Sequence, residues 1–173
     1  SIFNIILCQQ FGCGFFEEAT INLYDYIHCY INIPDTSNRD SLFQAEARQC
    51  KKILELIEEK SDKRHFCVFD ELYSGTNPYE AISSAYSYLS HISKNKNVRF
   101  LLTTHYIRLC KLFDKKTISN KSMKTLFKEN NDPHYTYKIT NGISTVKGGV
   151  SVLKNLKYPE NIINMTYKIL ENI

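Results

Sequence analysis

The stretch FCVFDELYSGTN, from Phe66 to Asn77, organises the interpretation of the whole sequence. It begins with four apolar residues, continues with Asp70 and Glu71, and ends in turn-forming residues that run into Pro78. A short apolar run that ends in turn residues is typical of a buried strand in a parallel sheet. Ligands bind at the carboxyl ends of such strands, so the two acids are expected where a ligand would lie. Two acids near a helix start can instead interact with the helix dipole, and this stretch alone leaves both interpretations open.

The first interpretation is a Walker B site for phosphoryl transfer. In such a site the Asp holds Mg²⁺ through water, and the next acid takes a proton from the water that attacks a phosphate. Short motifs of this kind also occur by chance, so the prediction depends on partner residues elsewhere in the chain.

Composition limits the class of protein. The chain has 173 residues, of which 43% are apolar and 23% charged, as is usual for one soluble globular domain. The net charge of +4 is a weak indication of an anionic partner and does not establish nucleic-acid binding. No apolar run approaches membrane-spanning length. Ser1 begins no convincing signal peptide, so we expect the chain to start inside a longer protein.

Six cysteines occur without any Cys-x-x-Cys pair, which argues against a disulfide framework and against a common zinc site. We expect reduced thiols in a reducing compartment, the cytoplasm or the nucleus. His28 beside Cys29 is compatible with a metal site, but no second pair accompanies it, and an ordinary pair on a strand is the favoured interpretation.

Upstream of the central stretch, a helix is expected from residue 1 to Gly12 and Gly14, and residues 18–33 predict one or two strands with a break near Asp25. After a polar loop at 34–40, a helix begins with Asp40 or Ser41 as its N-cap. Its apolar residues recur at helical spacing: Phe43, Ala47, Cys50, Leu54 and Ile57. A capped helix start such as Ser41 offers N–H groups to an anion, although position alone favours an ordinary surface helix.

Downstream, Pro78 begins a helix and residues 98–103 predict a second buried strand. His105 follows that strand, so it is expected at the same sheet edge as Asp70 and Glu71, where an imidazole can contact a terminal phosphate. The other expected elements are a helix at 107–113, a hairpin of strands 115–128 and 135–139 around the turn at 130–133, a helix at 150–156 and a last helix from Pro159. The lysines of 115–128 indicate a solvated face rather than a DNA contact.

Several motifs follow one another in the order of a known family. SLFQAE at 41–46 is similar to its signature STFMAE, DELYSGTN at 70–77 to DE(L/I)GRGTS, and TTHY at 103–106 to ATHY or ATHF. LCQQFGCGFFEE at 7–18 looks like LMAQIGCFVPA, and the segment 137–170 echoes the family's C-terminal pattern. Together they resemble the C-terminal ATPase domain of the MutS family of DNA mismatch-repair proteins, which belongs to the ABC-type P-loop ATPases. The resemblance implies an α/β P-loop NTPase fold over 1–173, with a mostly parallel sheet flanked by helices and a C-terminal hairpin and helices.

The sequence departs from this family at a few positions. Tyr73 and Ser74 replace Gly and Arg of the D-loop, and Leu42 replaces Thr of the signature. The Walker A loop G-P-N-x-x-G-K-S/T is absent, and the glycines of FGCGFF do not replace it because no Gly-Lys-Ser/Thr follows. We therefore expect the 173-residue chain alone to have negligible ATPase activity.

The resemblance also assigns roles. It implies ATP and Mg²⁺ as cofactors, Asp70 as the residue that holds Mg²⁺ through water, and Glu71 and His105 as catalytic residues. It further implies that Thr104 and Gln10 lie near the nucleotide. Ser41, Gly75 and Thr76 would face the ATP held by the other subunit of a homo- or heterodimer, and the C-terminal helices at about 149–173 would serve dimerisation. Mismatched DNA would be bound mainly by other domains, as an ATP-gated clamp, and no membrane contact is implied.

Two alternatives remain at this point. One is another ABC-type ATPase of DNA repair or recombination, which usually carries a longer signature with Gly-Gly and a coiled coil. The other is a non-catalytic dimerisation or DNA-clamp module with a degraded nucleotide site. The short signature SLFQAE disfavours the first alternative, and the presence of Asp70, Glu71 and His105 disfavours the second.

Overall fold

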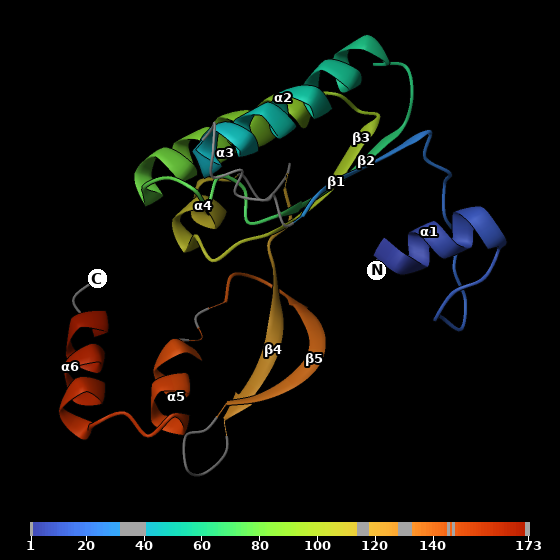
Figure 1. The fold of residues 1–173 in the computed structure, drawn as a ribbon. Helices are drawn as coiled ribbons and strands as arrows, with labels where there is room; N and C mark the ends of the chain where they lie inside the picture. Colours follow the sequence, from blue (N-terminus) through green and yellow to red (C-terminus); the bar gives the residue numbers. More distant parts are fainter. Residues whose placement is uncertain are drawn as a thin grey trace. The chain divides into compact units, whose positions relative to one another are not determined.

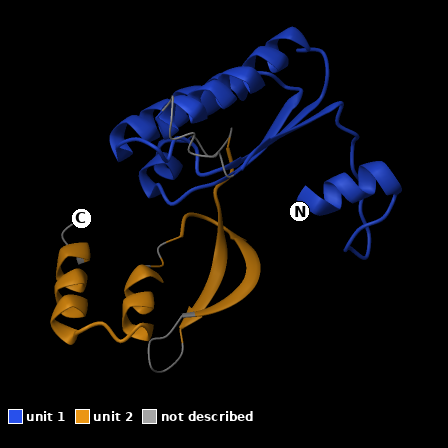
Figure 2. Cartoon of the chain, in the orientation of Figure 1, with its two compact units in different colours: residues 1–113 blue, residues 114–173 orange. Residues whose placement is uncertain are grey.

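The computed structural model describes residues 2–31, 41–113, 118–127, 133–144, 146 and 148–171. They fall into two compact units, residues 1–113 and 114–173 (Figure 2). The first unit contains a small parallel sheet with helices, and the second contains a hairpin followed by two helices. The chain is thus a mixed α/β protein, as the sequence indicates. No described helix is long and apolar enough to cross a membrane.

The sheet of the first unit has three parallel strands in the order β1-β2-β3. They span Tyr26–Tyr30, His65–Asp70 and Val98–Thr103. The central strand β2 is buried along its length except at Asp70, which confirms the buried strand expected from the apolar run. Asp70 pairs in register with Thr103, so β2 and β3 end at the same edge of the sheet.

Helices α2 (Leu42–Glu59) and α3 (Pro78–Ile92) lie on the same side of this sheet (Figure 1). Each begins where the sequence places its cap. Ser41 forms a capping box with Gln44, and the Asn77 side chain accepts from the first amides of α3 beside Pro78. The two helices bury one face each against Cys67 and Phe69 of β2 and so form the core of the unit. The short helix α4 (Ile107–Leu112) contributes Leu109 to the same core.

Strand β3 differs from the prediction. The sequence predicts a fully buried strand, but burial alternates, with Val98 buried and Arg99, Leu101 and Thr103 exposed. The reason is that β3 is an edge strand and that, among the described residues, helices cover only one face of it. An apolar run cannot distinguish a strand covered on both faces from one covered on a single face.

The expected strand after Asp25 is confirmed, and the described residues before Asp25 form no strand. Residues 18–33 were expected to form one or two strands, and within the described part only Tyr26–Tyr30 is a strand. Gln9 of helix α1 (Ile2–Phe11) accounts for the second of these observations, because its side chain donates to Tyr24 O at 2.7 Å and accepts from Tyr24 N at 2.9 Å. With both backbone groups satisfied, Tyr24 has no need of a strand partner. The loop expected at 34–40 lies outside the described residues.

The second unit contains the expected hairpin. Strands β4 (Lys121–Phe127) and β5 (Pro133–Asn141) pair antiparallel, with an irregularity between Met123 and Thr125. Helices α5 (Gly148–Asn155) and α6 (Glu160–Glu171) follow, and each buries one apolar residue, Val150 and Ile163. Residues 115–117 and 128 of the predicted basic strand and residues 130–132 of its turn lie outside the described residues.

A pair of histidines joins β1 to β2. His28 Nε2 lies 2.9 Å from His65 Nδ1, and His65 Nε2 lies 2.9 Å from Lys60 O. Since a carbonyl only accepts, His65 donates through Nε2 and accepts the His28 N–H at Nδ1. The Tyr26 ring stacks on His65 at 5.0 Å between centroids. His28 therefore acts as a neutral hydrogen-bond donor inside the sheet.

This histidine pair predicts a pH-dependent loss of stability. Burial, with His65 as the second cause, lowers the pKa of His28 to about 4. Its unfolded pKa is about 6.5, so its stabilising contribution is complete above pH 6.5 and is lost as the pH falls from 6.5 toward 4. After discounting for partial exposure, we expect the amides of β1 and β2 to lose about 1–2 kcal/mol of protection against hydrogen exchange over that range. The measurement compares the native full-length protein with His28→Gln; a difference that does not change with pH would contradict it.

Candidate nucleotide site

The carboxyl ends of β2 and β3 bring Asp70 and Glu71 together with residues of TTHY. The Thr103 hydroxyl donates to Asp70 Oδ1, and the Glu71 amide donates to Thr103 O at 3.0 Å. Glu71 has φ +52, in the left-handed region that side chains other than glycine rarely adopt. Such strain persists where the surrounding structure holds it, and it is frequent at functional sites. The positive φ of Glu71 ends the strand directly after Asp70 and changes the direction of the chain there.

Glu71 and His105 face each other at this edge. His105 Nε2 lies 3.0 Å from Glu71 Oε1, with side chains that are 91% and 47% exposed, respectively. Next to His105, the Thr104 hydroxyl accepts from the Tyr106 amide at 3.0 Å and so shapes the turn that carries the histidine. Because the carboxylate of Glu71 and the imidazole of His105 are both exposed to solvent, a ligand can reach the pair.

The donor set suits a hard divalent cation. Mg²⁺ prefers oxygen ligands, usually takes one or two carboxylates, and keeps several waters. Asp70 and Glu71 are adjacent carboxylates, and the hydroxyl of Thr103 fixes one oxygen of Asp70. The residues therefore fit the metal that the sequence motif implies, with Asp70 as the residue oriented for it.

A second group of candidate residues gathers at the start of α2. Ser41 caps this helix, and Gly75 approaches it so closely that a Cβ at Gly75 would lie 2.7 Å from Leu42 Cγ and from Phe43 N. A side chain at position 75 would thus displace the helix start. Thr76 is fixed by a hydrogen bond from its hydroxyl to Glu80 Oε2 at 2.6 Å. The structure therefore brings Gly75 against the start of the helix that Ser41 caps, while the contact of Thr76 is with α3.

Tyr73 shows what the departure from the D-loop pattern does. It has φ +59, a backbone conformation that glycine adopts without cost, and the family pattern has glycine there. The ring is buried and contacts Phe43 at 5.7 Å and Tyr88 at 6.5 Å between centroids. Aromatic burial thus offsets the backbone strain, and the loop is anchored to α2 and α3 by a side chain.

Gln10 is not brought to this edge. It is exposed on α1, a helix that Figure 1 shows apart from the sheet and from helices α2 and α3. Its neighbour Gln9 makes the contacts to Tyr24 described above. A role for Gln10 near the metal and water stays a prediction.

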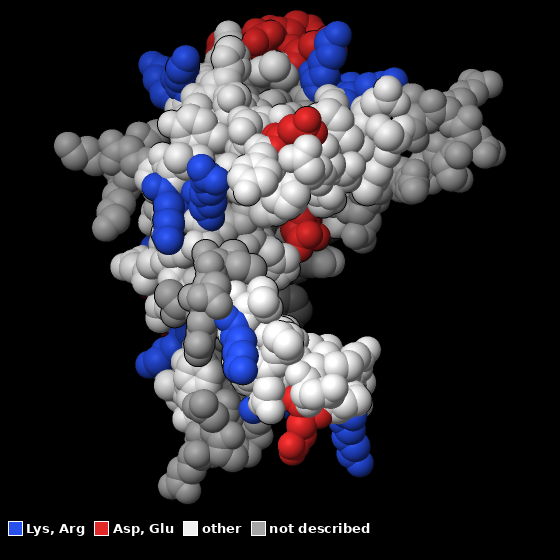
Figure 3. Space-filling view, turned by 90° about the vertical axis from the view of Figure 1, so that its left-hand side faces the viewer, with Lys and Arg blue, Asp and Glu red and all other residues white. Residues whose placement is uncertain are grey.

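The surface shows no large field of one sign on the face drawn in Figure 3, where Lys and Arg side chains are scattered and acidic groups lie among them. Lys121 and Lys124, the described lysines of the predicted basic strand, are both exposed on β4. This agrees with a solvated face on that strand.

Comparison with known proteins decides the family. A model of the family described as MutS domain V matches residues 2–173. The chain belongs to the MutS family. Within the family its sequence is 30% identical over 173 residues to the DNA mismatch repair protein MutS of Finegoldia magna, which covers 97% of this chain and 20% of that protein.

Other relatives in the MutS family have similar coverage. The chain is 32% identical over 161 residues to the DNA mismatch repair protein MutS of Clostridium botulinum, covering 91% of this chain and 17% of that protein. It is 28% identical over 172 residues to the DNA mismatch repair protein MSH2 of Saccharomyces cerevisiae, covering 93% of this chain and 17% of that protein. The chain thus spans about a fifth or less of the length of these relatives.

Proposed function

We propose that this chain is the ATPase domain of a MutS-type mismatch-repair protein, with a P-loop NTPase fold, and that it binds ATP and Mg²⁺ to gate a dimeric clamp on mismatched DNA. One observation carries the proposal: Glu71 contacts His105 at 3.0 Å directly beside the Asp70–Thr103 pair, at the carboxyl edge of a parallel sheet. The three relatives described above are named DNA mismatch repair proteins, which supports mismatch repair as the process.

Each residue at this edge would have a separate role in phosphoryl transfer. Asp70, oriented by Thr103, would hold Mg²⁺ through water, and the ion would neutralise charge on the phosphate oxygens when bound. Glu71 would accept the proton of the attacking water. His105 Nε2 would donate to the terminal phosphate once that ligand replaces Glu71 as its partner. Little covalent chemistry is needed, so positioning supplies most of the catalysis.

The group at the start of α2 would act on a different nucleotide. Ser41, Gly75 and Thr76 would line a dimer interface and face the ATP bound to the partner, where the helix N-terminus favours an anion. A ligand shared in this way stabilises the closed dimer, because it binds that state better than the open one.

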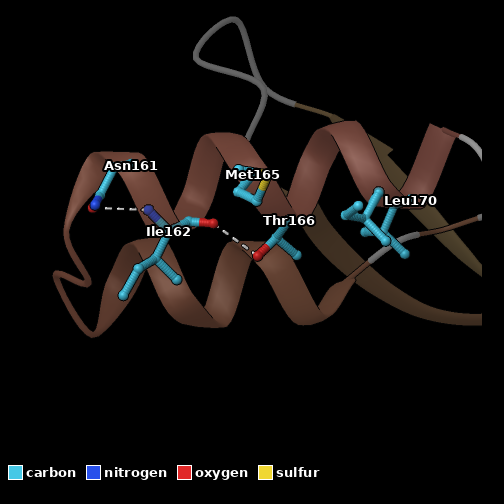
Figure 4. Close-up of a pocket in the computed structure, with 6 residues that line it drawn as sticks. Asn161, Ile162, Met165, Thr166 and Leu170 are labelled. Carbon is cyan, nitrogen blue, oxygen red and sulfur yellow. Dashed lines mark hydrogen bonds between the residues drawn. The ribbon is translucent and has the colours of Figure 1, made fainter.

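Helix α6 would supply part of the permanent dimer contact. Its exposed side carries a groove of about 560 Å³ lined by Asn161, Ile162, Met165, Thr166, Ile169 and Leu170 (Figure 4). Ile162, Met165 and Ile169 are exposed apolar residues spaced three and four positions apart, so they share one helix face. A face of this composition suits contact with a second copy of the domain.

Charge on that groove is expected to weaken the dimer. Met165→Glu would bury a carboxylate in an apolar contact and raise the dissociation constant of the full-length dimer by about tenfold or more. Asn164→Glu is the matched control, since Asn164 is exposed on the same helix and does not line the groove. Sedimentation equilibrium measures both variants; equal dissociation constants would remove α6 from the interface.

The proposed function is tested on the full-length protein at one fixed salt concentration. We expect it to hydrolyse ATP, to bind a duplex with one mismatch more tightly than the matched duplex, and to change its lifetime on DNA when ATP is added. Fluorescence anisotropy and phosphate release measure these properties. Hydrolysis without preference for mismatches would indicate another DNA transaction, and absence of hydrolysis would indicate a non-catalytic module.

A further inference from the structure

Glu46, the last residue of SLFQAE, is a buried acid. It lies on the buried side of α2 and is 2% exposed. Its Oε1 accepts from the Ser74 amide at 3.0 Å and from the Ser74 hydroxyl at 2.8 Å, and its Oε2 accepts from the Gly75 amide at 3.1 Å. All of these donors belong to the loop that follows β2.

The surroundings of Glu46 are built for a carboxylate that accepts. A buried charge is tolerated only where hydrogen bonds satisfy its oxygens, and both oxygens of Glu46 are satisfied by the loop. Tyr30 also borders it: burial raises the pKa of the Tyr30 hydroxyl, and the Glu46 charge acts in the same direction. Both carboxylate oxygens of Glu46 therefore bind the loop to helix α2, and Tyr30 of β1 is a further neighbour of this carboxylate.

Two further contacts join the same pieces. The Tyr73 ring packs against Phe43 of α2, and Gly75 touches the backbone at Phe43. The start of α2, with Ser41 as its cap, is thus joined to the loop of Gly75 and Thr76 by three sets of contacts. Glu46 supplies the hydrogen bonds that hold the backbone amides of this loop against the helix.

We propose that Glu46 is a positioning residue that fixes the loop of Tyr73, Ser74 and Gly75 against α2, so that the helix start and the loop meet the partner subunit's nucleotide as one rigid surface. This inference rests on the proposed function. Its distinctive consequence is that a change at Glu46 impairs hydrolysis in the partner subunit and spares the subunit that carries it.

The first test is steady-state ATP hydrolysis by full-length Glu46→Gln. The substitution keeps the length of the side chain but replaces one acceptor oxygen by an amide N–H₂, which then faces an N–H donor of the loop and leaves that donor without its acceptor. Misplacement of about 1 Å can cost about a hundredfold in rate, so we expect kcat to fall by about tenfold or more and KM for ATP to change by less than about twofold. Glu55→Gln is the matched control, because Glu55 is exposed on the same helix and forms an ion pair with Lys51 on the helix surface; it is expected to keep the native kcat.

The second test uses dimers of two differently tagged subunits. With Glu46→Gln in one subunit and Glu71→Gln in the other, the first subunit keeps its own acid and receives an intact surface from the second, so one site stays active. With both changes in one subunit and a native partner, the native site receives the disturbed surface and we expect little turnover. The reverse pattern would show that Glu46 serves its own site and would overturn the inference. If Glu46→Gln does not fold, Ser74→Ala replaces it, with a smaller fall in kcat and the same expected pattern.

Failure of the inference and failure of the proposed function give different results. A native protein that does not hydrolyse ATP contradicts the function itself. A native protein that hydrolyses ATP, with Glu46→Gln folded and at native kcat, contradicts only the role of Glu46.

Discussion

Replacing Glu71 by Gln in the full-length protein is expected to lower kcat for ATP hydrolysis by about 10²–10⁴-fold, the range in which general bases contribute. Gln keeps the shape of the side chain and can still contact His105, but it does not accept a proton from water at neutral pH. ATP affinity is expected to stay within about twofold, because Asp70 and Thr103 are unchanged. Single-turnover hydrolysis and equilibrium binding of a fluorescent ATP analogue measure the two quantities separately.

A second Glu–His pair provides the control for this experiment. Glu58 Oε1 lies 3.3 Å from His91 Nε2, between side chains that are both more than half exposed, on helices α2 and α3. Glu58→Gln therefore makes the same chemical change in a similar contact away from the carboxyl edge of the sheet. We expect native kcat from it. Unchanged hydrolysis by Glu71→Gln would rule out Glu71 as the key acid, and equal losses in both variants would point to a general effect on folding.

The parts of the fold that the sequence predicts are those set by local chemistry. Ser41 and Asn77 cap their helices because their side chains satisfy free amides, and Pro78 begins a helix because its ring suits the first turn. The apolar run before Asp70 becomes the central strand. Distant residues decide what the sequence leaves open. The side chain of Gln9 binds the backbone of Tyr24, so of the one or two strands expected around Asp25 the described residues form one. The prediction of a buried strand is wrong for β3, whose edge position leaves Leu101 exposed.

The position of the candidate site could be predicted from the sequence, but the backbone conformations and buried contacts that hold its residues could not. Parallel strands end at a common edge, and this rule alone places His105 beside Glu71. The positive φ of Glu71 and Tyr73 was not predictable, since each is imposed by surrounding contacts. Nor was the role of Glu46, because an acid within a helix usually faces water, and only its periodicity with Cys50, four residues later, indicates a buried face. The functional roles of these residues stay predictions.

Replacing Phe69 by Ala is expected to produce the largest loss of stability. The ring is fully buried near the carboxyl end of β2 and contacts Tyr30, Tyr88 and Phe100 at 5.8–6.3 Å between centroids. Truncation removes buried area and leaves a cavity, which together cost about 3–5 kcal/mol. Since whole domains are stable by only about 5–15 kcal/mol, this change is expected to bring the first unit close to unfolding.

The loss at Phe69 should also reach the candidate site, because Asp70 is the next residue and depends on the strand for its position. We therefore expect the amides of β1, β2 and β3 in full-length Phe69→Ala to lose most of their protection against hydrogen exchange and ATP hydrolysis to fall with them. Phe127→Ala makes the same change at an exposed ring of the hairpin in the other unit and should leave the sheet amides unchanged. Protection in Phe69→Ala within about 1 kcal/mol of the native value would mean that the core relaxes around the cavity. The packing of β2 against α2 and α3 would then not be what holds Asp70 and Glu71 in place.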